Sequence, residues 1–185
     1  MKEKVTYALF GGSFDPPHLG HSEIVKSLLK LDGVDRVLVV PTFLNPFKSS
    51  YSVDGKKRLE WVKEVFDFKG VEISAYEIEQ QRAVYTVETF RELSKKYNIK
   101  YIVIGADNLK SLSKWRDFEF LNSRVCWIVA TRAGSNLDFS SLREYKILNI
   151  SVDVSSSDIR DGKSLEFIEE KIKSQVLLEY NILKK

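Results

Sequence analysis

Short apolar runs alternate with amphipathic helical segments along most of the chain, and this alternation is the feature that most constrains the fold. The runs at Val37–Val40, Tyr101–Ile104 and Arg124–Ala130 are apolar at nearly every position. Strands of that kind are typical of parallel sheets whose two faces are both covered. Because parallel neighbours need long crossover connections, the strand–helix order predicts an α/β fold with an open parallel sheet and helices on both faces.

The expected elements can be bounded along the chain. We expect strands over residues 5–10, 36–41, 71–78, 101–104, 124–130 and 146–150. We expect helices from residue 19 onwards and over residues 54–68, 86–97, 108–121 and 165–180, with Asp54, Thr86 and Ser157 as N-terminal caps. The sequence contains no linker, repeat or low-complexity segment, so residues 1–185 are expected to form a single domain.

Charge and cysteine content limit the partners and the compartment. The formal net charge is +3 and the basic residues are scattered, which gives no reason to expect nucleic acid as a partner. Cys126 is the only cysteine, so an internal disulfide is excluded, and its apolar surroundings predict a buried thiol in a reducing cytoplasm. Neither a signal-peptide pattern nor an apolar stretch of about 20 residues occurs, so no membrane association is expected.

Unusual residues follow three of the expected strands. Phe10 is followed by two glycines, Val40 by a loop that contains Pro and Ser, and Ile104 by Gly105. In open parallel sheets, ligands bind beyond the carboxyl ends of the strands, where the strand order reverses. We therefore expect these three strand ends to share one site.

The loop after the first strand has the composition of an anion-binding turn. Gly11 and Gly12 allow a ligand to approach the backbone closely, and Gly20 does the same at the start of the next helix. The first N–H groups of a helix have no partner within it and favour phosphate. His18 and His21 are the only histidines in the chain, and each can donate a hydrogen bond to a phosphate oxygen.

Other interpretations of this loop can be compared with a phosphate site. Its spacing is neither the G-x-G-x-x-G dinucleotide motif nor a P-loop. His18 and His21 would supply only two ligands, and the chain has no other histidine to complete a zinc site, so no protein-held metal is expected. A histidine near a helix start is often structural, and from the residues alone this alternative stays open.

A superfamily signature is recognisable in the same loop. The HIGH-type nucleotidyltransferases carry a segment that resembles Gly12–Pro16 followed by His18–His21. The resemblance implies a Rossmann-like fold of the nucleotidyltransferase type and transfer from a nucleoside triphosphate, with both histidines on the triphosphate. Later motifs narrow the resemblance to the bacterial nicotinate mononucleotide adenylyltransferases, and the matches together extend to Arg160.

Two of these later motifs lie after the second strand and at a helix start. The family carries a Pro-Pro-His-Lys-like segment where this chain has Asn45–Lys48, and the resemblance places the Lys48 ammonium on phosphate. Its Ser-Tyr-Thr-x-x-Thr segment resembles Val84–Thr89, and it implies backbone amides close to the nicotinate carboxylate. Phe47 and Val84 depart from the family pattern, and their effect on the site stays open.

The most discriminating stretch runs from Gly105 to Trp115. It resembles the Gly-x-Asp-x-Leu…Trp pattern of the nicotinate enzymes. Asp107 can cap the next helix or accept a hydrogen bond from a ribose hydroxyl. Trp115 offers a flat face for a pyridine ring, although a tryptophan on an amphipathic helix is more often a core residue.

A last motif lies near the C-terminus. Val154–Arg160 resembles the Ile-Ser-Ser-Thr-x-Ile-Arg motif of the superfamily. Its serines can cap a helix whose N–H groups face the triphosphate, and the Arg160 guanidinium can bind two phosphate oxygens at once. The adenine is expected near Ser156–Ile159, and the nicotinate near Thr86 and Trp115.

Residues and resemblance together give the expected site. The expected catalytic residues are His18, His21, Lys48 and Arg160. The expected ATP contacts are Gly11, Gly12, Ser13, Phe14, His18, Gly20, His21, Gly105, Asp107, Ser156, Ser157, Ile159 and Arg160. The expected contacts of nicotinate mononucleotide are Lys48, Tyr85, Thr86, Asp107, Leu109, Trp115 and Arg132. Mg²⁺ is expected to arrive with ATP, held mainly by phosphates and water.

The implied reaction is attack of the 5′-phosphate of nicotinate mononucleotide on the α-phosphorus of ATP, which gives deamido-NAD and pyrophosphate. One alternative is a phosphopantetheine adenylyltransferase, a family with a similar first loop but Thr at the position of His18. A second is a non-catalytic nucleotide-sensing module. The sequence leaves the oligomeric state open. It also leaves open the preference for the acid over the amide acceptor, because that selectivity depends on backbone N–H groups, whose positions a sequence does not show.

Overall fold

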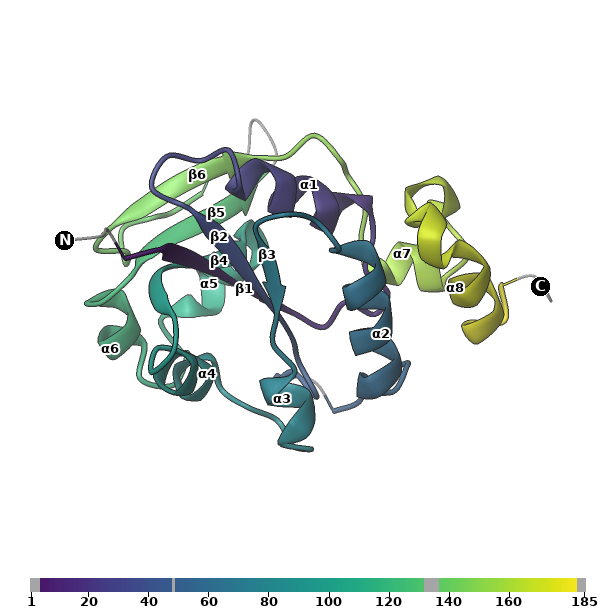
Figure 1. Cartoon of the computed structure of the whole chain (residues 1–185), viewed down its shortest axis with the longest axis horizontal. Helices are drawn as coiled ribbons and strands as arrows, with labels where there is room; N and C mark the ends of the chain where they lie inside the picture. Colours follow the sequence, from purple (N-terminus) through teal and green to yellow (C-terminus); the bar gives the residue numbers. More distant parts are fainter. Residues whose placement is uncertain (1–3, 48, 132–136, 183–185) are drawn as a thin grey trace.

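In the part of the chain that the structure describes, six parallel strands form one sheet in the order β3-β2-β1-β4-β5-β6 (Figure 1). The computed structural model describes residues 4–47, 49–131 and 137–182. Within these residues the strands are β1 Thr6–Gly12, β2 Arg36–Pro41, β3 Val71–Ile73, β4 Asn98–Gly105, β5 Cys126–Thr131 and β6 Tyr145–Asn149. The strand order reverses between β1 and β4, which is the Rossmann-type arrangement. The predicted fold class is confirmed.

Helices connect the strands and cover both faces of the sheet (Figure 1). The α-helices are α1 Leu19–Leu28, α2 Gly55–Val65, α3 Tyr76–Glu79, α4 Thr86–Leu93, α5 Leu109–Leu112, α6 Phe118–Asn122, α7 Ser156–Arg160 and α8 Lys173–Glu179. Three short 3₁₀ turns are η1 Ala106–Asn108, η2 Leu165–Phe167 and η3 Glu170–Ile172.

The two faces of the sheet contribute to two separate apolar cores, because successive strand residues point to opposite sides. Ala8 and Phe10 of β1 belong to the core that includes residues of α1, α2, α7 and α8. Leu9 belongs to the core that includes residues of α4, α5 and α6. The central strands therefore need apolar residues at every position, which is the pattern seen in the sequence.

Several element boundaries differ from the sequence-based expectations. The strand expected over residues 71–78 ends at Ile73, and helix α3 begins at Tyr76. The helix expected over residues 108–121 is broken into η1, α5 and α6, because Asp117 has a left-handed φ of 53° that a continuous helix cannot contain. The helix expected over residues 86–97 ends at Leu93.

The capping predictions are partly confirmed. Asp54 caps α2, and its side chain accepts a hydrogen bond from the Lys56 N–H. Ser155 caps α7 in place of Ser157, and its hydroxyl accepts a hydrogen bond from the Asp158 N–H at 3.1 Å. The N-cap of α4 is Tyr85, so the predicted cap Thr86 is its first helical residue.

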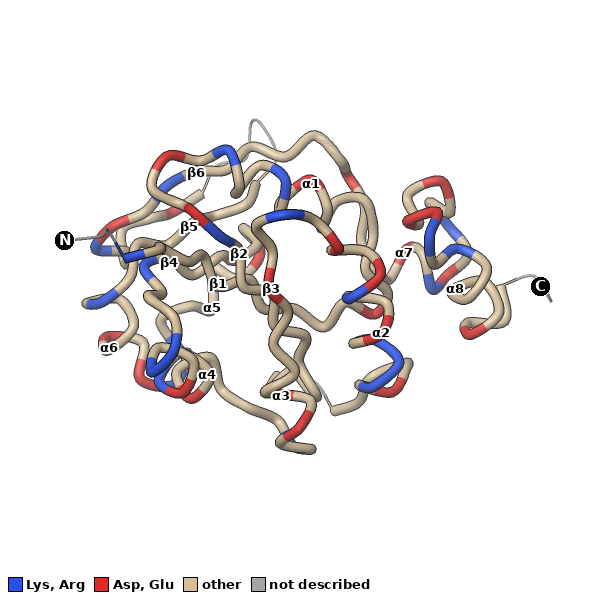
Figure 2. The backbone as a smooth tube through the Cα atoms, viewed as in Figure 1, with Lys and Arg blue, Asp and Glu red and all other residues tan. Residues whose placement is uncertain are grey.

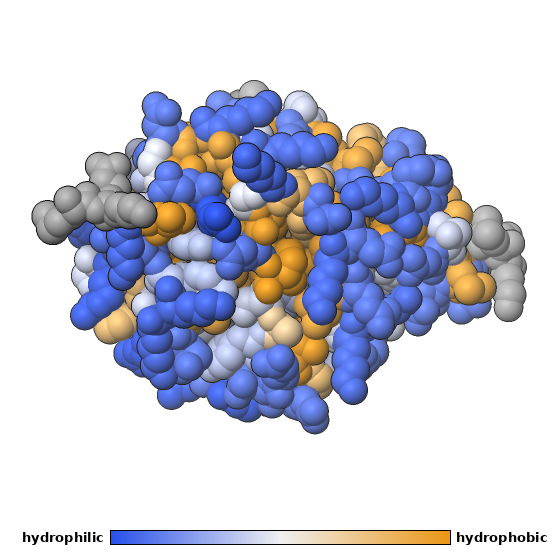
Figure 3. All heavy atoms as spheres, viewed as in Figure 1, coloured by the Kyte–Doolittle hydropathy of each residue, from blue (hydrophilic) through white to orange (hydrophobic). Residues whose placement is uncertain are grey.

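The surface carries charges of both signs. Figure 2 shows Lys and Arg interspersed with Asp and Glu along α2 and α8. On the face seen in Figure 3, hydrophilic side chains surround a narrow hydrophobic strip over β3. Within the residues that the structure describes, every helix is too short or too polar to cross a membrane.

Candidate active site

Two cavities open beside the carboxyl end of β4. The larger has a volume of about 600 Å³ and the smaller about 270 Å³. Gly105 and Asp107 line both of them, so the cavities meet where β4 ends beside β1. Ligands of open parallel sheets bind at this reversal of strand order. The two cavities thus form one composite site.

The larger cavity gathers most of the residues that were predicted to contact ATP. Those that line it are Ser13, Phe14, His18, Gly20, His21, Gly105, Asp107, Ser156, Ser157 and Arg160. Three of the predicted ATP residues lie elsewhere. Gly11 and Gly12 line the smaller cavity, because both still belong to β1 and pair with the end of β2. Ile159 is fully buried in the apolar core, where it holds α7 against the sheet.

The two histidines stack on one another at the start of α1. His18 is the N-cap, and its ring lies 3.7 Å from the ring of His21 at an angle of 24°. The Phe14 ring meets His21 edge to face at 5.0 Å and fixes the position of the stack. A Cβ at Gly20 would lie 3.1 Å from His18 Nδ1, so the glycine makes room for this imidazole. The predicted histidine pair is therefore a built feature of the cavity wall.

Both imidazoles are neutral at neutral pH in the free protein. Burial lowers the pKa of His18 to about 4. Burial, and then the neighbouring His18, hold the pKa of His21 well below its ordinary value. His21 Nδ1 accepts a hydrogen bond from the His18 backbone N–H at 3.2 Å, so in the neutral ring the proton sits on Nε2. His21 thus offers an N–H donor to the cavity without adding a charge.

The loop between β1 and α1 is tied to α7. The Arg160 guanidinium donates through Nη1 to the Asp15 carbonyl at 2.5 Å and through Nη2 to Ser157 Oγ at 3.0 Å. Ser156 Oγ donates to the Pro16 carbonyl at 2.9 Å. Helix α7 is short, and the two bonds to Asp15 and Pro16 hold it beside the histidine loop, while the bond to Ser157 lies within the helix. Arg160 lines the larger cavity while it fixes the loop.

Asp15 joins the same loop to two further segments. Its Oδ2 accepts a hydrogen bond from the Ser52 N–H at 2.9 Å. Its Oδ1 accepts one from the Tyr180 hydroxyl, which follows α8, at 2.6 Å. Asp15 is 6% exposed and lines the larger cavity. Asp15 therefore connects the first loop to the loop after β2 and to the C-terminal helix.

Arg58 of α2 forms hydrogen bonds to both loops that border the site, the loop after β1 and the loop after β2. Its side chain is buried and donates to four backbone carbonyls, those of Ser13, Thr42, Phe43 and Val53, at 2.5 to 2.8 Å. Burial is the main cause that lowers the pKa of this guanidinium, and the nearby Asp15 carboxylate opposes the shift. One buried cation thus binds the loop after β1 to the loop after β2.

The smaller cavity gathers most of the described residues that were predicted to bind nicotinate mononucleotide. Tyr85, Thr86, Asp107 and Trp115 line it. Leu109 does not, because its side chain turns into the apolar core from the first turn of α5 and is 9% exposed. The Leu109 side chain thus belongs to the core, and a ligand contact of Leu109 through its backbone stays a prediction.

Trp115 has features of both roles that the sequence left open. Its ring packs edge to face on Trp127, with centroids 6.3 Å apart and an angle of 78°. Trp115 is only partly buried, and it also lines the smaller cavity. The indole Nε1 is buried and has no hydrogen-bond partner among the described residues. The ring is thus a packed wall of the cavity.

Two of the predicted site residues, Lys48 and Arg132, lie outside the described residues. Within the described part of the chain, no group of three or more His, Cys, Asp or Glu side chains is placed to hold a metal ion.

Three site residues were missed by sequence reasoning. Arg58 could have been found, because it shares the buried face of α2 with Trp61, Val62 and Val65 at helical spacing. Asp15 lies within the Gly12–Pro16 segment of the superfamily signature, but sequence reasoning assigned it no specific role. Glu77 lines the smaller cavity, and nothing in its local sequence distinguishes it from the exposed Glu79 two residues later.

Comparison with known proteins agrees with this geometry. A family model described as cytidylyltransferase-like matches residues 9–162. A protein of Sulfurovum sp. (strain NBC37-1), named probable nicotinate-nucleotide adenylyltransferase, is 40% identical over 176 residues, which cover 95% of this chain and 94% of the relative. A protein of Campylobacter jejuni (strain 81-176) with the same name is 41% identical over 181 residues, which cover 96% of this chain and 98% of the relative.

The fold also matches a solved structure. Nicotinic acid mononucleotide adenylyltransferase of Plasmodium falciparum, solved in complex with NaAD, superposes with a TM-score of 0.75 over 97% of each chain at 20% identity. That likeness concerns the fold, whereas the family assignment depends on the matches in sequence. The chain therefore belongs to the cytidylyltransferase-like family and, within it, to the nicotinate-nucleotide adenylyltransferases.

Proposed function

We propose that the protein transfers the adenylyl group of ATP to the 5′-phosphate of nicotinate mononucleotide in NAD biosynthesis. The observation that carries the proposal is the meeting of two cavities at Gly105 and Asp107, one beside the histidine pair and one beside Trp115. Two substrates bound in these cavities would bring their phosphates together at the end of β4. The names of the relatives support the same reaction.

The chemical step is a direct displacement at phosphorus. An oxygen of the acceptor's 5′-phosphate attacks the α-phosphorus of ATP, the bond from that phosphorus to the bridging oxygen of the β-phosphate breaks, and pyrophosphate leaves. The attacking phosphate is already ionised at neutral pH, so no general base is needed. The protein must align the two phosphates and stabilise the charge that builds on the transferred group and on pyrophosphate.

Specific side chains can fill that role. The His21 Nε2–H and the His18 ring donate hydrogen bonds to the triphosphate from the wall of the larger cavity. Arg160 adds a fixed positive charge beside them, and we propose that Lys48 adds another. Neutral donors bind phosphate oxygens without a proton having to be released or taken up as ATP enters.

The remaining assignments follow the cavity walls. We place the adenosine along Ser156 and Ser157 in the larger cavity. The nicotinate ring is placed in the smaller cavity against Trp115 and Thr86. Gly11 and Gly12, which line the same cavity, leave room for the acceptor's sugar and phosphate near the end of β1.

We propose that Mg²⁺ enters with ATP, bound mainly by phosphate oxygens and water. The Asp15 carboxylate, which lines the same cavity as the histidines, has both oxygens engaged by Ser52 and Tyr180, so it fits a structural role better than that of a metal ligand. When bound, the ion would neutralise part of the charge on the pyrophosphate. We also propose that residues 1–185 act as one domain and that the enzyme works in the cytoplasm, where its substrate ATP is supplied.

The test is a coupled pyrophosphate assay with ATP and three acceptors. Nicotinate mononucleotide, nicotinamide mononucleotide and phosphopantetheine are offered separately, and a reaction without acceptor is the control. We expect the highest kcat/KM with nicotinate mononucleotide and no pyrophosphate without an acceptor. Preference for phosphopantetheine would instead identify the runner-up enzyme, and silence with all three would favour a nucleotide sensor.

A further inference from the structure

The smaller cavity contains a buried carboxyl group that the proposed reaction does not use. Glu77 of α3 lines this cavity and is 5% exposed. Its Oε1 accepts a hydrogen bond from Thr89 Oγ1 at 2.6 Å. Its Oε2 is buried and has no hydrogen-bond partner among the described residues. A buried polar atom without a partner is costly, so Oε2 is a candidate for hydrogen bonding to a ligand.

The position of this oxygen relates it to the acceptor. Val84, Tyr85 and Thr86 line the same cavity at the start of α4, and Thr89 lies one turn further along that helix. The first N–H groups of a helix have no partner within it and favour an anion. Glu77 therefore stands beside the end of the cavity where an anionic group of the acceptor is best accommodated.

The chemistry of the two oxygens gives Glu77 a defined role there. A carboxylate would repel an anionic ligand, whereas a carboxylic acid can donate one hydrogen bond to it. Thr89 donates to Oε1, which leaves Oε2 as the oxygen that carries the proton. Burial raises the pKa of Glu77 to about 7, the Thr89 hydrogen bond opposes this shift, and the charge of Glu88 adds to it.

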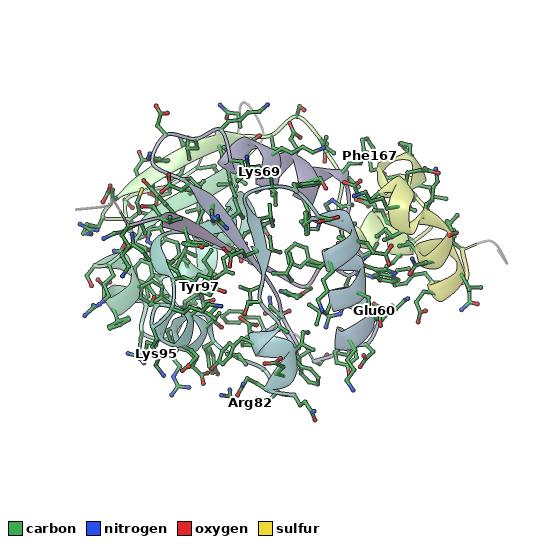
Figure 4. All side chains as sticks on the ribbon, in the orientation of Figure 1. Glu60, Lys69, Arg82, Lys95, Tyr97 and Phe167 are labelled. Carbon is green, nitrogen blue, oxygen red and sulfur yellow. The ribbon has the colours of Figure 1, made fainter. Side chains whose placement is uncertain are left out.

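The charges on the neighbouring helix do not neutralise this carboxyl. Glu88 of α4 is paired with Arg82 at 2.8 Å, and Arg82 points away from the sheet at the rim of the molecule (Figure 4). On α3 itself, burial raises the pKa of the Tyr76 phenol above its ordinary value, so this side chain is uncharged at neutral pH. Glu79 on the same helix is exposed.

The other packed elements carry few charges towards Glu77. Arg58 of α2 directs its guanidinium to backbone carbonyls. Asp107 and Arg116 are exposed residues on the wall of the smaller cavity, and Arg116 lies over the Tyr85 ring at 5.0 Å. Strand β2 presents only apolar residues after Arg36. Within the described residues, none of these cations forms an ion pair with Glu77.

We propose that Glu77 is a specificity-determining residue, whose Oε2–H donates a hydrogen bond to the carboxylate on the acceptor's pyridine ring. The proposal rests on the proposed function, because it names a contact of the same acceptor. Protonated Glu77 favours the acid acceptor. Ionised Glu77 repels the acid and can accept a hydrogen bond from the amide of nicotinamide mononucleotide. The acid-over-amide preference therefore depends on the protonation of one buried side chain.

The first test needs only the wild-type protein. The kcat/KM for the acid is divided by the kcat/KM for the amide at a series of pH values from about 6 to 8.5. Titration of ATP and of the 5′-phosphate affects both acceptors equally and cancels in this ratio. We expect the ratio to fall by on the order of tenfold as pH rises, the size expected for loss of a hydrogen bond to a charged group.

The second test compares two matched variants. Glu77→Gln keeps an N–H donor at every pH, so its acid preference should stay and should no longer vary with pH. Glu79→Gln removes the same charge from an exposed position of the same helix, and should keep the wild-type pH profile. Thermal melting of both variants checks that each is folded.

These measurements separate the possible outcomes. A wild-type ratio that is constant or rises with pH overturns the role of Glu77, and it does so without any variant. A pH-dependent ratio that survives in folded Glu77→Gln also overturns it, because another group must then titrate. Absence of pyrophosphate release with both pyridine acceptors would instead contradict the proposed function itself.

Discussion

The two histidines at this site are placed to donate hydrogen bonds rather than to exchange protons. The stacked pair His18 and His21 is held neutral by burial, and His21 Nδ1 already accepts a backbone hydrogen bond. Each ring can therefore donate to phosphate while it stays uncharged. We expect no histidine titration between about pH 6 and pH 8 in the kcat/KM for ATP.

The contribution of His21 can be measured by truncation. His21→Ala should lower kcat by about 100-fold or more, the loss typical of one missing transition-state donor. Lys26→Ala, an exposed change in the last turn of the same helix, is the control and should leave kcat unchanged. If folded His21→Ala keeps more than half of the wild-type kcat, the ring is structural.

Burial of His18 also predicts how stability varies with pH. Its pKa is about 4 in the folded protein and about 6.5 when unfolded, so the unfolded chain binds more protons between these values. This contribution to the free energy of unfolding is complete above about pH 6.5 and is lost as pH falls towards 4. The loss from this residue amounts to about 3 kcal/mol.

The raised pKa of Glu77 acts in the opposite direction over part of this range, so the raw pH curve does not isolate His18. The difference in urea-unfolding free energy between wild type and His18→Gln removes the Glu77 contribution and reports His18 together with its effect on the neighbouring His21. That difference should shift in favour of His18→Gln by up to about 3 kcal/mol between pH 7 and pH 4.5. A difference that does not vary with pH would mean that His18 has the same pKa in the folded and unfolded states.

Trp115 is the residue expected to distinguish the two substrates. Loss of stacking should weaken acceptor binding by roughly 1–3 kcal/mol, or about 5- to 150-fold in KM where KM follows affinity. Trp115→Ala should leave the KM for ATP nearly unchanged, because the ring lines only the smaller cavity. Equal weakening of both substrates in a stable variant would contradict stacking, and a lower melting temperature would reveal its packing on Trp127.

Residues in recognisable motifs could be predicted from sequence, and residues that act through burial could not. The histidine loop was predicted from its residue types at a helix start, and Arg160 from the resemblance of residues 154–160 to a superfamily motif; both line the larger cavity. Glu77 was missed because its burial depends on how α3 packs against β2 and α4. Leu109 and Ile159 lie inside motifs yet point into the core, since a sequence motif does not show side-chain direction.

At the level of elements, the site depends on segments that are far apart in sequence but are tied to one loop. Helix α7, the loop before α2 and the segment after α8 all bond to residues 13–16. Arg160 contributes twice, because its fork reaches both a loop carbonyl and Ser157. A change of this side chain should alter both the loop and the phosphate-binding charge.

Arg160→Lys tests this double role. Lysine keeps the charge but cannot hold two acceptors in a planar fork, so kcat/KM for ATP should fall by about tenfold or more. Arg124→Lys is the matched control. Arg124 lies just before β5, its exposed guanidinium donates a hydrogen bond to the Phe120 carbonyl, and a lysine in its place should leave kcat/KM unchanged. If Arg160→Lys and wild type have equal kcat/KM for ATP, the guanidinium has no specific role and Arg160 acts only as a surface charge.

Element order was predictable, while several boundaries were not. Apolar runs identified the four inner strands β1, β2, β4 and β5, because central parallel strands are buried on both faces. The edge strands β3 and β6 are more exposed and less apolar. The end of β3 at Ile73 and the break at Asp117 were missed, since both depend on tertiary contacts rather than on local periodicity. The sheet that positions the site thus follows from the sequence, and the shape of the smaller cavity does not.

In the whole molecule, the carboxyl ends of the inner strands form one site for two substrates. The larger cavity lies towards α1 and α7, the smaller lies towards α3 and α4, and the end of β4 separates them. Substrates that enter from opposite sides would meet with their phosphates adjacent. This arrangement requires no covalent enzyme intermediate, because the two reacting groups can contact each other directly.

The most direct test of this account follows oxygen through the reaction. Nicotinate mononucleotide labelled with ¹⁸O in its phosphate is reacted with unlabelled ATP, and the products are weighed by mass spectrometry. Direct displacement predicts that all of the label stays in the dinucleotide and none enters pyrophosphate. Label in pyrophosphate, or release of pyrophosphate from ATP before any acceptor is added, would contradict direct attack of the acceptor phosphate on the α-phosphorus.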